Sequence, residues 1–161
     1  MLHTLPTAHF DRFVAAATQA YAADNVSVGR WDAASAAGLA AAEFKQLLPE
    51  GIATPDHFFH EIVEAPGGAA MGYVWFGAMQ RGTRRIAYLY QLLVLPAYRR
   101  QGHARAALIA LEGIAREQRF DALALNVFAS NEAAHALYRS AGFAATAISM
   151  QKPLTNAAAP G

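Results

Sequence analysis

Apolar residues in the first fifty positions recur at spacings of three and four, which is the period of an amphipathic helix. Between His9 and Ala23 the recurring positions are Phe10, Phe13, Val14, Ala17 and Tyr21. Thr7 precedes this segment and is the expected N-cap residue. A second helix is expected from Asp32 to Leu48, because Pro49 and Gly51 follow it directly. The first third of the chain is therefore expected to be helical.

From residue 57 the pattern changes to short apolar and alternating runs that are typical of strands. Strands are expected over residues 57–65, 70–79 and 85–95, with turns at Pro66-Gly67-Gly68 and Arg81-Gly82-Thr83. The rest of the chain predicts a helix over 104–119, a strand over 122–128, a helix over 131–141 and a last strand over 143–152.

This order of elements predicts an α/β fold with one mixed sheet flanked by helices. Short turns between the early strands indicate antiparallel pairs, whereas helices between the later strands indicate parallel neighbours joined by crossovers. A chain of 161 residues has room for one compact domain. We place this single domain at residues 1–154 and expect residues 155–161 to be a disordered tail.

Composition and charge exclude several classes of function. Thirteen basic and twelve acidic side chains give a net charge of +1, so no global field would attract nucleic acid or a membrane surface. The absence of cysteine excludes disulfides and a thiolate nucleophile, and the six histidines lack the HExxH spacing, so no metal is expected. The chain lacks both a secretory signal pattern and an apolar run of the roughly 20 residues that a membrane span needs, so a cytoplasmic protein is expected.

Tyr98 to Ala104 read YRRQGHA and connect an apolar strand to an alanine-rich helix. Gly102 would allow a ligand to approach the backbone, and the free amides and dipole of the helix start would attract an anion, with nearby arginines adding charge. The plainer interpretation is ordinary turn chemistry beside a solvated basic pair. Neither GxxxxGK[ST] nor GxGxxG occurs, which argues against a nucleoside-triphosphate or dinucleotide site.

A second motif, NEAAHALYRSAGF, begins at Asn131, a residue type that favours the helix N-cap. Tyr138 lies seven positions later on the same helix face, and Gly142 and Phe143 end the helix. Taken alone, Tyr138 would be interpreted as a core aromatic residue.

Together these stretches, over about residues 57–154, resemble the GNAT superfamily of N-acetyltransferases. Arg99, Gly102 and Ala104 fall at the defining places of the family's Arg/Gln-x-x-Gly-x-Gly/Ala loop, and the second motif is similar to the family's Asn, Leu-Tyr and Gly-Phe segment. The resemblance implies the GNAT fold and acetyl-CoA as the acyl donor.

The resemblance also implies roles for individual residues. The strand end at Leu93, Val94 and Leu95 would carry a bulge that opens a gap for the pantetheine arm, with the Val94 N–H on the thioester carbonyl. Asn131 would contact the pantetheine or position its helix, and Tyr138 would be the general acid that protonates the leaving thiolate. The pyrophosphate would be bound by the loop residues Arg99, Arg100, Gln101, Gly102, His103, Ala104 and Arg105.

The general base and the acceptor are left open by the sequence. Many relatives carry an acidic residue where this chain has Gln91, Leu92 and Leu93, and no base is assigned; the weak candidates are His60, Glu61, Glu64 and Glu132. The acceptor is expected to be a primary amine of a small molecule, peptide N-terminus or lysine. An aromatic acceptor pocket could draw on Trp31, Tyr73, Trp75, Phe76 and Tyr90, with alternation placing Tyr73 and Trp75 on one face.

The alternative is a non-catalytic acyl-CoA-binding sensor or partner module, which the missing strand carboxylate suggests. Exposed edge strands would allow a homodimer.

Overall fold

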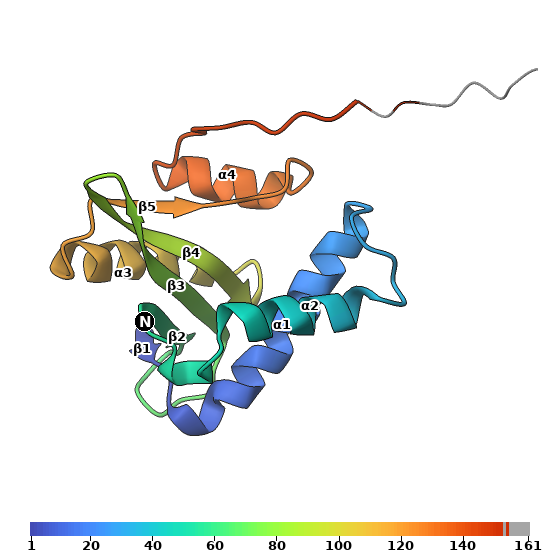
Figure 1. Ribbon diagram of the computed structural model, residues 1–161. Helices are drawn as coiled ribbons and strands as arrows, with labels where there is room; N and C mark the ends of the chain where they lie inside the picture. The colour runs from blue at the N-terminus through green and yellow to red at the C-terminus, as the bar shows by residue number, and fades with distance from the viewer. Residues whose placement is uncertain (153, 155–161) are drawn as a thin grey trace, which may run out of the picture.

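The computed structural model, which describes residues 1–152 and 154, contains one five-stranded sheet in the order β1-β2-β3-β4-β5 (Figure 1). Its strands are β1 (Leu2–Thr4), β2 (His57–Ile62), β3 (Gly72–Arg81), β4 (Arg84–Val94) and β5 (Ala122–Leu125). The first four strands are antiparallel neighbours and β5 is parallel to β4. The mixed sheet expected from the sequence is confirmed, with β1 as an additional edge strand that the pattern did not indicate.

The α-helices are α1 (Phe10–Ser27), α2 (Ala36–Leu47), α3 (His103–Glu117) and α4 (Glu132–Ser140). Short 3₁₀ helices occur at η1 (Thr7–His9), η2 (Gly51–Ala53) and η3 (Pro96–Tyr98). The expectation of Thr7 as an N-cap is wrong, because η1 precedes α1 and makes His9 the N-cap residue. The expected start of the second helix at Asp32 is also wrong, because the Asp32 carboxylate accepts the N–H groups of Ala34 and Ser35 and forms a turn before α2.

The helices cover the two faces of the sheet with separate cores. On one face, Phe13 of α1 and Phe44 of α2 pack with Phe59, Tyr73 and Trp75 of the sheet. On the other face, the buried residues of α3 and the partly buried residues of α4 pack on a second cluster. Its buried members on the sheet are Ile62, Val74, Phe76, Ala87 and Leu89. The predicted alternation along β3 is confirmed, since Tyr73 and Trp75 face α1 and α2 while Val74 and Phe76 face α3.

A bulge in β4 changes which side chains face which core. Trp75 pairs with Gln91 and Phe76 with Leu89, so Tyr90 is the extra residue. In a regular strand, Leu89 and Leu93 would face the same side because they are four residues apart. Across the bulge they do not: Leu89 packs on the α3 side and Leu93 on the α1 side. The expectation of a bulge around Leu93 to Leu95 is therefore corrected to Tyr90. The bulge leaves Tyr88 and Tyr90 in edge-to-face contact, 4.9 Å between ring centroids.

The last expected strand, over residues 143–152, does not occur. These residues have no strand pairing, and residues 144–152 are all exposed. Figure 1 shows the chain turning at the end of α4 and running back past this helix as an extended segment. The expected disordered tail, residues 155–161, lies outside the described residues. Within the part that is described, no helix is long and apolar enough to cross a membrane.

Candidate functional site

The sheet opens between β4 and β5. The two strands pair only from Ile86 with Ala122 to Leu89 with Leu125, so the second half of β4 has no strand beside it on this side in the described part of the chain. The N–H of Leu95 donates to the carbonyl oxygen of Met71 on the β3 side, at 2.9 Å. Because successive amides of a strand point in opposite directions, the N–H of Val94 points into the opening.

The start of α3 lies at the end of this opening and presents free amides. Gly102 is the N-cap residue, with a φ of 83°, and it caps the helix without a side-chain hydrogen bond. The first intrahelical bond runs from the N–H of Ala106 to the Gly102 carbonyl, at 3.0 Å, which leaves the amides of residues 103–105 without a helical partner. A Cβ on Gly102 would meet no protein atom within 4 Å, so the glycine faces open space. These amides and the helix dipole form a site for an anion.

Arginine side chains surround this helix start. Arg99 donates from Nε to the Val94 carbonyl at 3.0 Å, and Arg105 donates to Ser140 Oγ of α4 at 3.2 Å. Arg100 is exposed and has a φ of 63°, an uncommon conformation for a residue other than glycine. Asp24 of α1 faces Arg99; partial desolvation raises the pKa of its carboxyl, and the arginine opposes that shift.

Tyr138 is positioned by the way α4 begins and ends. The Asn131 side chain accepts the N–H of Ala134 at 3.0 Å and so caps the helix start. At the other end Gly142 has a φ of 87°, and bonds from Phe143 N–H to the Tyr138 carbonyl and from Gly142 N–H to the Arg139 carbonyl form a Schellman motif. The rings of Tyr138 and Phe143 are in edge-to-face contact at 5.6 Å. Burial raises the pKa of Tyr138, which keeps its phenol protonated.

These elements line one cleft of about 620 Å³. Of the residues that the sequence singled out, the cleft is lined by Leu93, Val94, Arg99, Arg100, Gly102, His103, Ala104, Arg105, Asn131 and Tyr138. Leu95 and Gln101 are not in the lining. Leu95 packs on the core beneath α1, and the exposed Gln101 side chain donates to the Ala97 carbonyl at 3.2 Å.

A smaller aromatic pocket of about 310 Å³ adjoins the cleft. Both hollows are lined by Tyr21, Tyr90, Gln91, Asn126, Val127 and Phe128. In the smaller pocket Tyr90 stacks on Trp75 at 4.6 Å, and the Tyr21 hydroxyl donates to Glu43 Oε2 at 2.7 Å. Burial and this bond to Glu43 raise the pKa of Tyr21. Trp75 and Tyr90 were expected in such a pocket, whereas Trp31, Tyr73 and Phe76 do not line it.

Sequence reasoning missed the carboxylates that face these hollows. Asp24 lines the cleft, and Glu43 lines the aromatic pocket with Arg30. Each lies on an amphipathic helix, and the helical period gives only its face. One local signal was available for Glu43. It precedes the core residue Phe44, and this neighbour places Glu43 at the border of the buried helix face.

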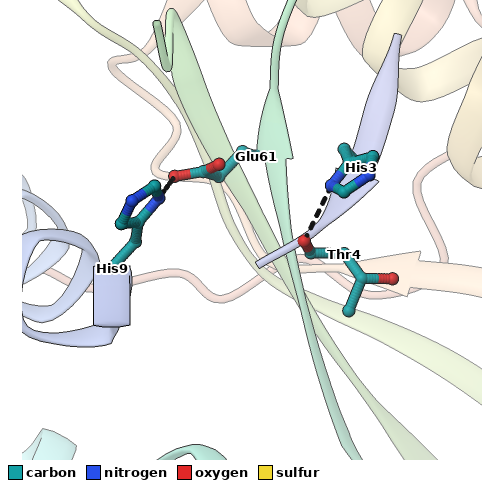
Figure 2. A network of polar contacts seen from close by, with 4 residues as sticks. All are labelled: His3, Thr4, His9 and Glu61. Carbon is teal, nitrogen blue, oxygen red and sulfur yellow. Dashed lines mark hydrogen bonds and ion pairs between the residues drawn. The ribbon is translucent and has the colours of Figure 1, made fainter. Parts of the chain in front are cut away.

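The four weak candidates for a base lie away from the cleft lining. Glu61 is buried, and its Oε1 is 2.9 Å from His9 Nδ1 (Figure 2). His60 stacks on Phe76, and burial lowers its pKa to about 4. Glu64 and Glu132 are exposed. Among residues 1–152 and 154, no group of three or more histidine, cysteine or acidic side chains is arranged to hold a metal ion.

The site and fold have known counterparts. Residues 29–143 match the Acetyltransferase (GNAT) family. The chain is 32% identical over 154 residues to the uncharacterized N-acetyltransferase YycN of Bacillus subtilis strain 168, covering 96% of this chain and 98% of the relative. It is also 32% identical to YdgE of the same organism, named as an uncharacterized N-acetyltransferase, covering 95% and 97% of the two chains.

Solved structures agree in fold. The crystal structure of YycN superposes with a TM-score of 0.89 at 32% identity, covering 97% of this chain and 99% of YycN. A point mutant of the BH1408 protein from Bacillus halodurans has a TM-score of 0.76 at 19% identity over 96% and 99% of the chains, which is a likeness of fold. The match over most of the chain and the identity to YycN lead to one conclusion: this protein belongs to the GNAT family of acetyltransferases.

Proposed function

We propose that the protein is an N-acetyltransferase that transfers the acetyl group of acetyl-CoA to a primary amine by direct attack in a ternary complex. The observation that carries this proposal is the shared wall between the cleft and the aromatic pocket. Two hollows that meet at common residues suit a reaction in which the donor and the acceptor are bound at the same time.

The donor would occupy the cleft. Its pyrophosphate would lie at the free amides of α3, and Gly102 leaves room there for close approach. Its pantetheine arm would run between β4 and β5 and bond to the unpaired edge of β4, as an added strand does. The Val94 N–H would then donate to the thioester carbonyl and stabilise the oxyanion that forms when this carbonyl is attacked.

The amine nitrogen attacks the thioester carbon, the C–N bond forms, and collapse of the tetrahedral intermediate breaks the C–S bond. The sulfur leaves as a thiolate that needs a proton, and Tyr138 would supply it because its raised pKa keeps the phenol protonated. An amine that arrives as an ammonium loses one proton before attack, because only the neutral nitrogen has a lone pair, and it loses a second proton after the C–N bond forms. Both protons pass to solvent or to a carboxylate that faces these hollows. Asp24 and Glu43 are such carboxylates, and their place in the linings supports an enzyme over a non-catalytic module.

The aromatic pocket would take the acceptor. Tyr88 and Tyr90 offer rings that attract a cation, the buried Trp75 backs Tyr90, and Glu43 offers a negative charge. An amine that arrives protonated would be held by these groups at the junction with the cleft. This pocket favours an acceptor whose amine is carried on a compact apolar or aromatic body.

The proposal is tested by thiol release from acetyl-CoA with a panel of primary amines, peptides and lysine derivatives. We expect turnover with amines that fit the pocket. In Glu43→Gln, the KM for the preferred amine should rise about tenfold or more, the scale of a lost charge-assisted contact, while the KM for acetyl-CoA stays within twofold.

Glu50→Gln is the matched control, because Glu50 is exposed and lies outside both linings. It should leave both KM values unchanged. Acetyl-CoA binding by calorimetry without turnover on the whole panel would instead support the non-catalytic binding module. An unchanged amine KM in Glu43→Gln would remove Glu43 from acceptor recognition.

A further inference from the structure

Two opposite charges line the aromatic pocket without pairing. Arg30 and Glu43 both belong to its lining, and neither lines the donor cleft. Among the described residues, these two are the only charged members of that lining. Within residues 1–152 and 154, neither side chain takes part in an ion pair. A pocket with one positive and one negative group, both open to a ligand, suits a molecule that carries one charge of each sign.

Arg30 lies in the connection between α1 and α2, where a buried asparagine holds it (Figure 1). Asn25 is fully buried, and its side-chain amide donates to the Tyr21 carbonyl at 2.8 Å. The Asn25 backbone carbonyl accepts the Arg30 N–H at 2.9 Å, and the Asn25 side-chain oxygen accepts from Arg30 Nη1 in a long bond of 3.4 Å. This is the one hydrogen bond of the guanidinium to the described residues. Since a guanidinium has five N–H groups, most of them are left for a ligand.

Glu43 is joined to the wall between the pocket and the cleft. Its Oε2 accepts the Tyr21 hydroxyl at 2.7 Å, and Tyr21 lines both hollows. Burial and Glu43 raise the pKa of Tyr21, and the charge of Arg30 opposes that rise. Both charges therefore act at one hydroxyl, and a compact molecule lying beside it would reach the two of them.

The donor does not need Arg30. Its phosphates would lie at the start of α3, where Arg99, Arg100 and Arg105 line the cleft. The pocket that Arg30 lines has a volume of about 310 Å³, which is small for a ligand site. An arginine binds a planar carboxylate through two parallel N–H···O bonds. One arginine opposite one carboxylate therefore matches a small zwitterion better than a polyamine or a multiply charged anion.

We propose, resting on the function proposed above, that the acceptor is an amino acid or a close relative, whose carboxylate binds Arg30 while Glu43 holds its amine beside the thioester. Its apolar part would lie against Tyr88 and Tyr90. The carboxylate takes no part in bond making: the C–N bond forms, the C–S bond breaks and the thiolate takes a proton. The products are an N-acetyl amino acid and free CoA. A peptide N-terminus or a lysine within a protein has an amide in place of this carboxylate and would be disfavoured.

The test compares amines that differ in the carboxylate alone. Each of the common apolar and aromatic amino acids is set beside its amide and the amine that lacks the carboxyl group, for example phenylalanine, phenylalaninamide and phenethylamine. Thiol release from acetyl-CoA is measured at matched concentrations of the neutral amine, because the carboxyl group changes the basicity of its neighbour. For the preferred amino acid we expect a kcat/KM about tenfold or more above those of its amide and its plain amine, the scale of a charge-assisted contact.

Arg30→Gln should raise the KM for the preferred amino acid about tenfold or more and leave the KM for its amide unchanged. Arg30→Lys keeps the charge and loses the planar fork, so its KM should lie between those of the wild type and Arg30→Gln. Arg12→Gln is the matched control, because Arg12 is an exposed arginine of α1 outside both linings. In all three variants the KM for acetyl-CoA should stay within twofold, which shows that the fold is kept.

Two results would overturn this inference and leave the proposed acetyl transfer standing. One is turnover of the amides or plain amines with no preference for the amino acids. The other is an Arg30→Gln variant whose KM for the preferred amino acid is unchanged. Failure of the acetyl transfer itself gives a different result, CoA binding without turnover of any amine, and that result would overturn both.

Discussion

At the scale of single residues, the proposed function depends on groups whose surroundings are set by caps and turns. Tyr138 is the last residue but two of α4, and both ends of that helix are closed by hydrogen bonds. Its partly buried phenol has a raised pKa, so it stays a proton donor through the neutral range.

Tyr138→Phe is expected to lower kcat by about 10- to 1,000-fold, the contribution typical of general acid catalysis. The KM for acetyl-CoA should change little, because the ring and its contact with Phe143 are kept. In the wild type, any fall in rate caused by ionisation of this phenol should be half complete only above pH 10, since burial raises its pKa above the usual value. Stopped-flow thiol release measures kcat for the variant and the pH dependence of the rate for the wild type. Equal kcat values in the variant and the wild type would remove Tyr138 from the chemistry.

Gly102→Glu is expected to raise the KM for acetyl-CoA by about tenfold or more, through steric block and like charge at the phosphates. Gly82→Glu is the matched control, because Gly82 also has a positive φ and no protein atom near its missing Cβ, but it lies in the hairpin between β3 and β4. Both variants should lose about 1 kcal/mol from backbone strain. Only Gly102→Glu should lose CoA binding in a calorimetric titration; a normal titration would place the pyrophosphate elsewhere.

At the scale of elements, the sequence predicted the helices and the inner strands. It did not predict the features that depend on pairing between strands, namely the place of the bulge and the absence of the last strand. The loop at Gly102 and the α4 motif were predicted because turn and cap residues act locally. The bulge at Tyr90 was misplaced because its position was carried over from the family resemblance. YLYQLLVL, apolar except for Gln91, carries no alternation that would locate the shift of face. The last strand was predicted from an alternating pattern that residues 144–152 do have, but in the described structure this segment pairs with no strand.

Asn131→Ala is expected to destabilise α4 by about 1 kcal/mol, the usual cost of a lost N-cap bond. Because α4 buries no residue fully, this loss should act on the helix itself, seen as faster hydrogen exchange of its amides. Asn131→Asp keeps an acceptor at the cap and should exchange like the wild type. Slow exchange in Asn131→Ala would mean that the helix is held by contacts other than its cap.

At the scale of the whole molecule, stability should depend on pH through His60, which stacks on Phe76 inside the sheet. Burial lowers the folded pKa of His60 from 6.5 to about 4, with repulsion from His3 adding to the effect. The unfolded chain therefore binds more protons between these values. Stability should be complete above about pH 6.5 and fall as the pH decreases toward 4, by at most ~3 kcal/mol.

His60→Phe keeps a flat ring for the stack and removes the titration. In urea unfolding at pH 8, 6 and 4.5, the variant should lose less stability on acidification than the wild type does. Parallel pH profiles for the two proteins would assign the acid sensitivity to other groups, such as His57, whose pKa is also lowered by burial.

The pairing between β4 and β5 is short, since it runs only from Ile86 to Leu89 on the β4 side. A donor lying in the opening would bond to main-chain groups of β4 beyond this stretch and contact α4 as well. Saturation with CoA should therefore slow hydrogen exchange in β5 and α4 and raise the melting temperature with the logarithm of CoA concentration.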